Sequence, residues 1–246
     1  MPGVTVHPWM RIAICFFVTM MGVPAYAATL EQFGGGFGVV DNSSAWARAI
    51  ASFPAAGGRL ELGCGGSYRF ASPVTTSSYI EIKGCGGEGT TTIDCSAITA
   101  LAPCLSFTGY GVRLNGFLVL SPTGAGIAAS NSAFVEIEDV DVVDNRALDA
   151  NVWSHSCITL YNVWETSIED VRLVTCRTFA LEVNGYNTTL TVSRLYGDHP
   201  AKSCVMLNGL TYAHFDTPAC DSSGDYAYWV RNSGAVTFTS PGAEYA

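Results

Sequence analysis

The sequence predicts an all-β fold, a single-stranded parallel β-helix (a solenoid) with a short capping α-helix near its N-terminus. The first reason is a repeat that runs from the middle of the chain to its end. In each repeat the third residue of an alternating segment is apolar: Ile137, Ile168, Val192, Phe215 and Phe238. The intervals are 31, 24, 23 and 23 residues. Such a period is typical of stacked coils that need neighbours to bury their apolar faces.

Composition is the second reason. The 246 residues are 48% hydrophobic and 13% charged, with 26 Gly, which favours one packed domain over a disordered chain. The formal net charge of −9 leaves no basic surface of the kind that nucleic acid or anionic lipid requires. We therefore expect no nucleic-acid partner and no membrane contact by the mature protein.

Residues 1–27 read as a signal peptide. Arg11 precedes an apolar run over residues 12–23, and Ala25-Tyr26-Ala27 forms an A-x-A cleavage signature. The run is shorter than the roughly 20 residues that span a bilayer, although an uncleaved anchor is the alternative. The expected location is extracellular (secreted) or periplasmic.

Residues 28–58 predict a loop followed by the capping helix. Polar residues 41–44 supply N-cap candidates. Trp46, Ala49, Ile50 and Phe53 then fall on one helical face. Such a face can cover the open apolar end of the first coil, so we expect Trp46 to pack within the cap.

This region resembles the start of pectate-lyase-superfamily proteins, which include polygalacturonase-like enzymes and phage tailspikes. The shared layout is a Phe-Gly loop (Phe33-Gly34 or Phe37-Gly38), an Asp-rich cap with a short Ala-Ile helix, then Gly-Gly, a strand and Gly66-Ser67-Tyr68. The usual Asp-Gly of the loop is replaced by Gly36-Phe37-Gly38. The resemblance implies a right-handed β-helix and a polysaccharide partner.

Residues 59–246 are assigned to the solenoid. We expect its coils to begin at Arg59, Ile80, Val112, Val135, Thr166, Leu190, Ala213 and Val236. A second strand in the later coils is followed by an asparagine suited to a stacked turn: Asn162, Asn184, Asn208 and Asn232. The last coil starts close to the end of the sequence. We therefore expect either a C-terminally truncated fragment or a second subunit over that end, as in the homotrimer that a tailspike resemblance allows.

The cysteines indicate disulfides. Eight of the nine follow the predicted signal peptide, and an even number in a secreted chain favours pairing. The sequence singles out two pairs, Cys64 with Cys85 and Cys95 with Cys104. For the remaining four cysteines, both disulfides and buried free thiols are compatible with the sequence.

The ordinary glycosidase signatures of the resembled family are absent. Its Asn-Thr-Asp position reads Ser154-His155-Ser156 and its Asp-Asp position reads Lys202-Ser203. Ionisable and aromatic side chains nevertheless gather on that side of the coils and could perform acid–base work. The catalytic candidates are Asp198, His199, His155, Lys202 and Asp225, and the substrate-binding candidates are Asp149, Trp153, Arg177 and Tyr196.

Two functions follow. The first is a secreted protein that binds and cleaves polysaccharide, as a glycoside hydrolase or a polysaccharide lyase. No metal site and no cofactor are expected, except Ca²⁺ if the protein is a lyase. The alternative is a non-catalytic β-helix that serves as a tailspike-like, adhesion or structural module.

Overall fold

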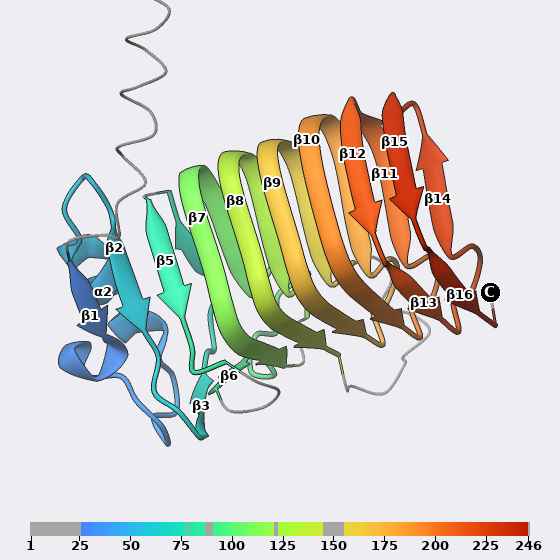
Figure 1. Ribbon diagram of the computed structural model, residues 1–246. Helices are drawn as coiled ribbons and strands as arrows, with labels where there is room; N and C mark the ends of the chain where they lie inside the picture. The colour runs from blue at the N-terminus through green and yellow to red at the C-terminus, as the bar shows by residue number, and fades with distance from the viewer. Residues whose placement is uncertain (1–25, 78, 87–90, 121–122, 145–154, 246) are drawn as a thin grey trace, which may run out of the picture.

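A computed structural model of the chain describes residues 26–77, 79–86, 91–120, 123–144 and 155–245. The coils stack side by side into one elongated right-handed parallel β-solenoid of about seven turns (Figure 1). The predicted fold class is confirmed. The assigned signal peptide, apart from its last two residues, and the candidates Asp149 and Trp153 lie outside the described residues.

The N-terminal end carries the one α-helix among the described residues. Strand β1 (Ala27–Thr29) pairs with β2 (Gly58–Glu61), and the short 3-10 helix η1 (Leu30–Phe33) and helix α2 (Ser43–Ser52) follow β1 in the sequence. Trp46 is 1% exposed and stacks edge-on against Phe70 with ring centroids 5.7 Å apart. The predicted packing of Trp46 in the cap is confirmed.

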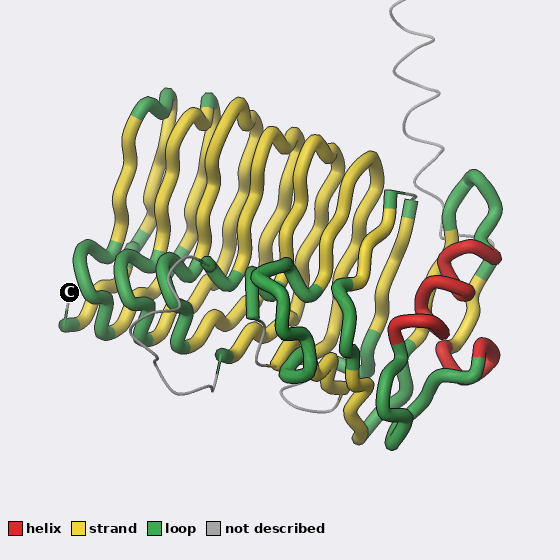
Figure 2. Tube along the Cα trace, turned by 180° about the vertical axis from the view of Figure 1, so that it is seen from behind, coloured by secondary structure: helices red, strands yellow, loops and turns green. Residues whose placement is uncertain are grey.

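Three parallel sheets form the sides of the solenoid, which we call faces A, B and C in chain order. The long strands each pass through all three faces: β7 (Leu105–Leu120), β8 (Ile127–Val143), β9 (Ile158–Val174) and β10 (Leu181–Asp198). Face A also contains β4 (Val74–Thr76), β11 (Val205–Leu210) and β14 (Tyr228–Arg231). Figure 2 shows the solenoid from behind, with face A turned toward the reader.

Faces B and C are completed by short strands. Face B contains β1, β2, β5 (Ile80–Lys83), β12 (Tyr212–Asp216) and β15 (Ala235–Thr239). Face C contains β3 (Gly66–Arg69), β6 (Thr91–Asp94), β13 (Ala219–Asp221) and β16 (Gly242–Glu244).

The apolar repeat found in the sequence is the inner column of face B. Ile137, Ile168, Val192, Phe215 and Phe238 are register partners on successive strands. The first four are at most 1% exposed, so each coil buries its apolar residue against the next. The coil starts are also in register, except that Gly58 rather than Arg59 pairs with Ile80.

Asparagine ladders form where face A turns into face B, which we call the A/B corner. The amide of Asn208 donates to Asn184 Oδ1 at 2.7 Å, and that of Asn232 donates to Asn208 Oδ1 at 3.0 Å. Asn162 donates to Asn131 and has a positive φ of 52°. The predicted role of these asparagines in stacked turns is confirmed.

The eight cysteines of the described residues form four disulfides: Cys64–Cys85, Cys95–Cys104, Cys157–Cys176 and Cys204–Cys220. The two pairs singled out in the sequence are confirmed, and the other four cysteines are paired rather than free. Such a set indicates an extracellular or otherwise oxidising compartment. Among the described residues, no helix is long and apolar enough to cross a bilayer.

Candidate functional site

The turns that lead from face C to face A, here called the C/A corner, stack directly on one another. Thr178 N–H donates to His155 O at 3.1 Å, Lys202 N–H donates to Thr178 O at 2.8 Å, and Asp225 N–H donates to Lys202 O at 3.0 Å. Three of the predicted catalytic residues therefore occupy one column, at about 4.8 Å per coil. The sequence predicted that these residues gather on one side of the coils, and the family resemblance located His155 and Lys202 at its motif positions.

A pocket of about 270 Å³ opens beside this column on face A. Its floor includes Ala128, Thr159 and Glu182, which are register partners on β8, β9 and β10. The remaining lining residues come from loops of the C/A corner and its neighbourhood: Leu101, Pro103, Gly124, Ala125, His155 and Ser156. The pocket thus combines apolar walls with a few polar groups, which is the usual composition of a ligand site.

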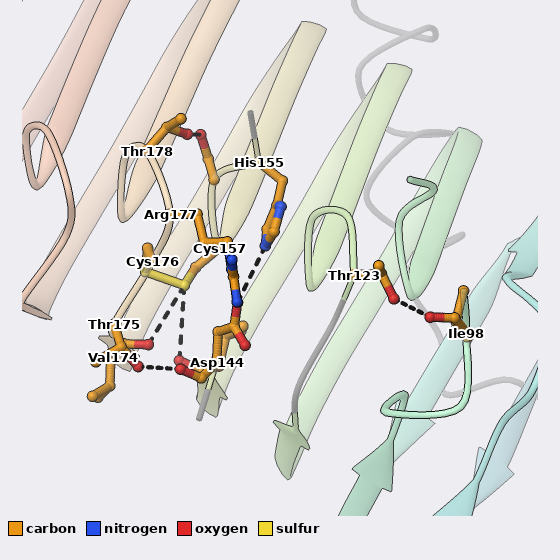
Figure 3. Close-up of polar contacts among 12 residues, drawn as sticks. Ile98, Thr123, Asp144, His155, Cys157, Val174, Thr175, Cys176, Arg177 and Thr178 are labelled. Atoms are coloured by element: carbon orange, nitrogen blue, oxygen red, sulfur yellow. Dashed lines mark hydrogen bonds and ion pairs between the residues drawn. A yellow bond between two sulfur atoms is a disulfide. The ribbon is translucent and has the colours of Figure 1, made fainter. Parts of the chain in front are cut away.

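His155 is held by a buried acidic group. Its Nε2 lies 3.4 Å from Asp144 Oδ2, and Arg177 Nε donates to the same oxygen at 2.8 Å (Figure 3). Their side chains are 1% to 6% exposed. Because the carboxylate can only accept, Nε2 carries the shared hydrogen. The remaining ring nitrogen, Nδ1, is buried and has no hydrogen-bond partner among the residues that the structure describes.

Glu182 and Ser156 supply a second polar pair in the pocket. Ser156 Oγ donates to Glu182 Oε2 at 2.6 Å. Because that bond uses the only hydroxyl hydrogen of Ser156, Thr178 must be the donor in its 2.9 Å contact with Ser156 Oγ. The chain of hydroxyls fixes the Glu182 carboxylate at the pocket floor.

The Cys157–Cys176 disulfide fixes these groups in place. Cys157 follows His155 and Ser156, and Cys176 precedes Arg177 and Thr178. Figure 3 shows the disulfide beside the Asp144 contacts. The covalent link therefore holds the two chain segments that supply the polar groups of the pocket.

An aromatic and cationic strip continues face A toward β14. The rings of Phe179 and Trp229 have centroids 6.0 Å apart. Lys202 Nζ lies 5.8 Å from the Phe179 ring centroid, and Arg231 Cζ lies 4.9 Å from that of Trp229. Trp229 remains 36% exposed, so the strip offers an apolar surface flanked by positive charge.

Asp198 and His199 lie elsewhere, at the end of face C. They hydrogen-bond to each other through His199 Nδ1, and His199 adopts a positive φ of 50° at the turn. Asp198 is in register with Asp221 on the next coil. Burial raises the pKa of the neighbouring Tyr196, and the negative charges of Asp198 and Asp221 raise it further. These residues form a second cluster, which we call the face C cluster.

The predicted site residues therefore divide into two groups. His155, Arg177, Lys202 and Asp225 gather at the face A side of the C/A corner, whereas Asp198, His199 and Tyr196 belong to the face C cluster. Sequence reasoning did not select Asp144, Ser156, Phe179, Glu182 or Trp229. A signal existed for Glu182, because it is the only charged residue at its position in the aligned second strands.

Within the part of the chain that the structure describes, no group of three or more His, Cys, Asp or Glu side chains could hold a metal ion. The Asp144 carboxylate is already in contact with His155 and Arg177, and Glu182 with Ser156. Calcium binding was expected only for a lyase and stays a prediction.

Comparison with known proteins gives the fold. No known protein-family model matches the chain, and no curated protein matches its sequence. Among solved structures, the tailspike of Acinetobacter phage vb_AbaP_AS12 is similar with a TM-score of 0.69 and 12% identity, over 91% of this chain. The chain spans about half of that tailspike, 46% of its length.

Two further similar structures carry enzyme names. The alginate lyase from Paenibacillus sp. str. FPU-7 has a TM-score of 0.58 at 12% identity, over 78% of this chain and 73% of the lyase. A candidate glycosyl hydrolase from Parabacteroides merdae has a TM-score of 0.56 at 15% identity, over 88% and 95% of the two chains. At such identities the similarity shows the β-helix fold alone.

Proposed function

We propose that this protein binds a polysaccharide on face A and cleaves a glycosidic bond in the pocket at His155 and Glu182. The observation that carries the proposal is that His155 lines this pocket and has a buried Nδ1 without a hydrogen-bond partner in the described part of the chain. A buried polar atom without a partner costs about 1–3 kcal/mol. A hydroxyl group of a bound sugar would supply the missing partner.

The polar groups of the pocket suit acid–base chemistry. Asp144 engages Nε2 of His155, so Nδ1 is the ring atom that exchanges a proton with the substrate. Glu182 uses Oε2 to accept from Ser156, and its Oε1 can accept a hydrogen bond from water or from a sugar hydroxyl. In hydrolysis His155 acts as the imidazolium: it gives its Nδ1 proton to the leaving glycosidic oxygen as the C–O bond breaks, while Glu182 takes a proton from the water that attacks the anomeric carbon. In elimination neutral His155 takes a ring C–H proton at Nδ1, a C=C bond forms, the C–O bond to the leaving sugar breaks, and the leaving oxygen takes up a proton from water.

The strip beyond the pocket extends the binding surface. Trp229 presents a partly exposed ring on which a sugar can stack, and Lys202 and Arg231 flank the strip with positive charge. The fold is shared with a structure named as a tailspike and with one named as an alginate lyase, which is consistent with a polysaccharide ligand. Membership of the pectate-lyase superfamily, secretion, and calcium binding by a lyase belong to the same proposal.

A non-catalytic role is the second candidate. It is favoured by the pairing of the acidic groups, because Asp144 is engaged by Arg177 and His155 and Glu182 is engaged by Ser156. In this alternative the pocket and the strip bind a glycan without cleaving it, and the solenoid acts as a tailspike-like scaffold, including as a homotrimer.

The test incubates the oxidised protein with acidic and neutral polysaccharides. Reducing ends and the absorbance of unsaturated products are followed together. Reducing ends alone identify a hydrolase, and both signals identify a lyase. We expect Glu182→Gln and His155→Gln to lower turnover at least about 100-fold, with binding retained.

The matched control is Glu138→Gln, an exposed face B carboxylate that accepts from Asn115, and it should retain full turnover. Glycan binding that depends on Trp229 but gives no products would support the scaffold alternative. A loss of turnover in Asp198→Asn, with Glu182→Gln unaffected, would move the reaction to the face C cluster.

A further inference from the structure

Exposed aromatic side chains gather along the A/B corner, on the side of face A away from the C/A corner. This corner is the upper edge in Figure 1, where strands β7 to β10 bend from the back of the solenoid to its front. We define the aromatic ridge as six residues whose exposures range from 40% to 87%: Tyr79, Tyr110, Tyr161, Trp164, Tyr186 and Tyr212.

The strand register places these residues along the axis of the solenoid. Tyr110 is in register with Ala133, and Ala133 with Trp164. Tyr79 precedes the strand one coil before Tyr110, whereas Tyr186 and Tyr212 belong to the two coils after Trp164. The ridge therefore covers five coil steps, about 24 Å at about 4.8 Å per step.

Glycines on the neighbouring coil make room for two of the rings. A Cβ atom at Gly111 would lie 2.2 Å from the Tyr79 ring, and one at Gly185 would lie 3.0 Å from the Tyr161 ring. Both glycines have positive φ values, 72° and 89°, which favour glycine. The two rings thus rest against bare backbone, and this contact fixes their position while about half of each side chain stays exposed.

The surroundings of the ridge are polar but almost uncharged. The corner segments 109–111, 131–134, 162–165, 185–189, 209–212 and 232–235 contain a single charged residue, Glu165. The asparagine ladders, such as Asn184 with Asn208, run along the same corner. Fixed aromatic rings beside amide groups match a sugar, because the apolar C–H face stacks on a ring and the hydroxyls bond to amides.

We propose that the aromatic ridge is a second glycan-binding site, which holds a neutral, hydroxyl-rich polysaccharide parallel to the solenoid axis. The ridge lies across face A from the pocket and contains no acid–base pair, so it anchors the glycan without cleaving it. Its corner segments contain no cation, and only at the last coil does Arg231 of the strip adjoin them, as the register partner of Asn208. The inference shares a glycan ligand with the proposed function but does not require cleavage.

The test measures the binding of the full chain to insoluble neutral glycans (cellulose, chitin, mannan and β-1,3-glucan), with alginate gel as the acidic comparison. The ridge variant is Tyr110→Ala/Tyr186→Ala/Tyr212→Ala, whose side chains are each more than half exposed. We expect the affinity of this variant for the neutral glycan that the parent protein binds to fall about tenfold or more, since each stacked ring contributes to the binding free energy. Binding to alginate should change less than twofold.

The control variant is Tyr226→Ala/Tyr245→Ala, which removes two exposed tyrosines outside the ridge. It should bind as the parent does. The inference would be overturned if the parent protein bound none of the neutral glycans. It would also be overturned if the ridge and control variants bound them equally. A change of oligomeric state confined to the ridge variant would overturn it as well, because the ridge would then be an interface between copies. If Glu182→Gln has no effect on turnover while the ridge variant loses binding, the pocket proposal fails and this one stands.

Discussion

Replacing Asp144 by alanine should destabilise the protein strongly. The carboxylate is 1% exposed and contacts both Arg177 Nε and His155 Nε2 through one oxygen. Removing one partner from a buried ion pair costs about 3–5 kcal/mol, because the remaining charge stays buried. At about 2–4 °C per kcal/mol for a chain of this size, the melting temperature should fall by about 6–20 °C.

Urea unfolding with the disulfides intact measures this cost through tryptophan fluorescence. The informative comparison is Asp144→Leu/Arg177→Met, which replaces the pair with apolar groups and should recover most of the lost stability. A free-energy loss below about 1 kcal/mol for Asp144→Ala would show that the buried ion pair does not stabilise the fold in this way. Equal losses for the single and double variants would contradict the prediction as well, because the cost would then not come from the Arg177 charge that remains buried without Asp144.

Three further predictions concern the solenoid itself. Ile168→Ala should cost about 2–5 kcal/mol, because it opens a cavity in the fully buried column of face B, whereas the neighbouring Ser167→Ala should be nearly neutral in the same urea titration. Asn208→Ala breaks the ladder between Asn184 and Asn232 and should cost about 1 kcal/mol; no change in the urea midpoint would exclude a structural ladder. Burial raises the pKa of Tyr228 to about 12 from its ordinary value near 10. The unfolded chain therefore loses this proton first, so stability should fall as the pH rises from about 10 to about 12, and Tyr228→Phe should reduce that fall in alkaline unfolding curves.

The architecture could be predicted because every coil of a solenoid has the same packing requirement. Each coil must bury an apolar residue at the same place, so Ile137, Ile168 and Val192 revealed the period without knowledge of distant contacts. The pairing of Cys64 with Cys85 followed from the same logic, since their matching Gly-Cys-Gly-Gly strings fall on neighbouring coils.

The site could be predicted only in part. The column of His155, Lys202 and Asp225 follows from the coil spacing. Asp144 was harder to identify, because it lies 11 residues before His155 and the coil repeat does not relate the two positions. Trp229 and Phe179 meet across two coils, and no local sequence pattern indicates which of many aromatic residues face outward.

Glycan cleavage at the face A pocket is best tested by an experimental structure of Glu182→Gln with a bound oligosaccharide taken from a polysaccharide that the parent protein cleaves. We expect a sugar in the pocket, with a hydroxyl or glycosidic oxygen within hydrogen-bond distance of His155 Nδ1 and with further sugars over Trp229. An oligosaccharide bound instead on face C, beside Tyr196 and Asp198, would contradict it.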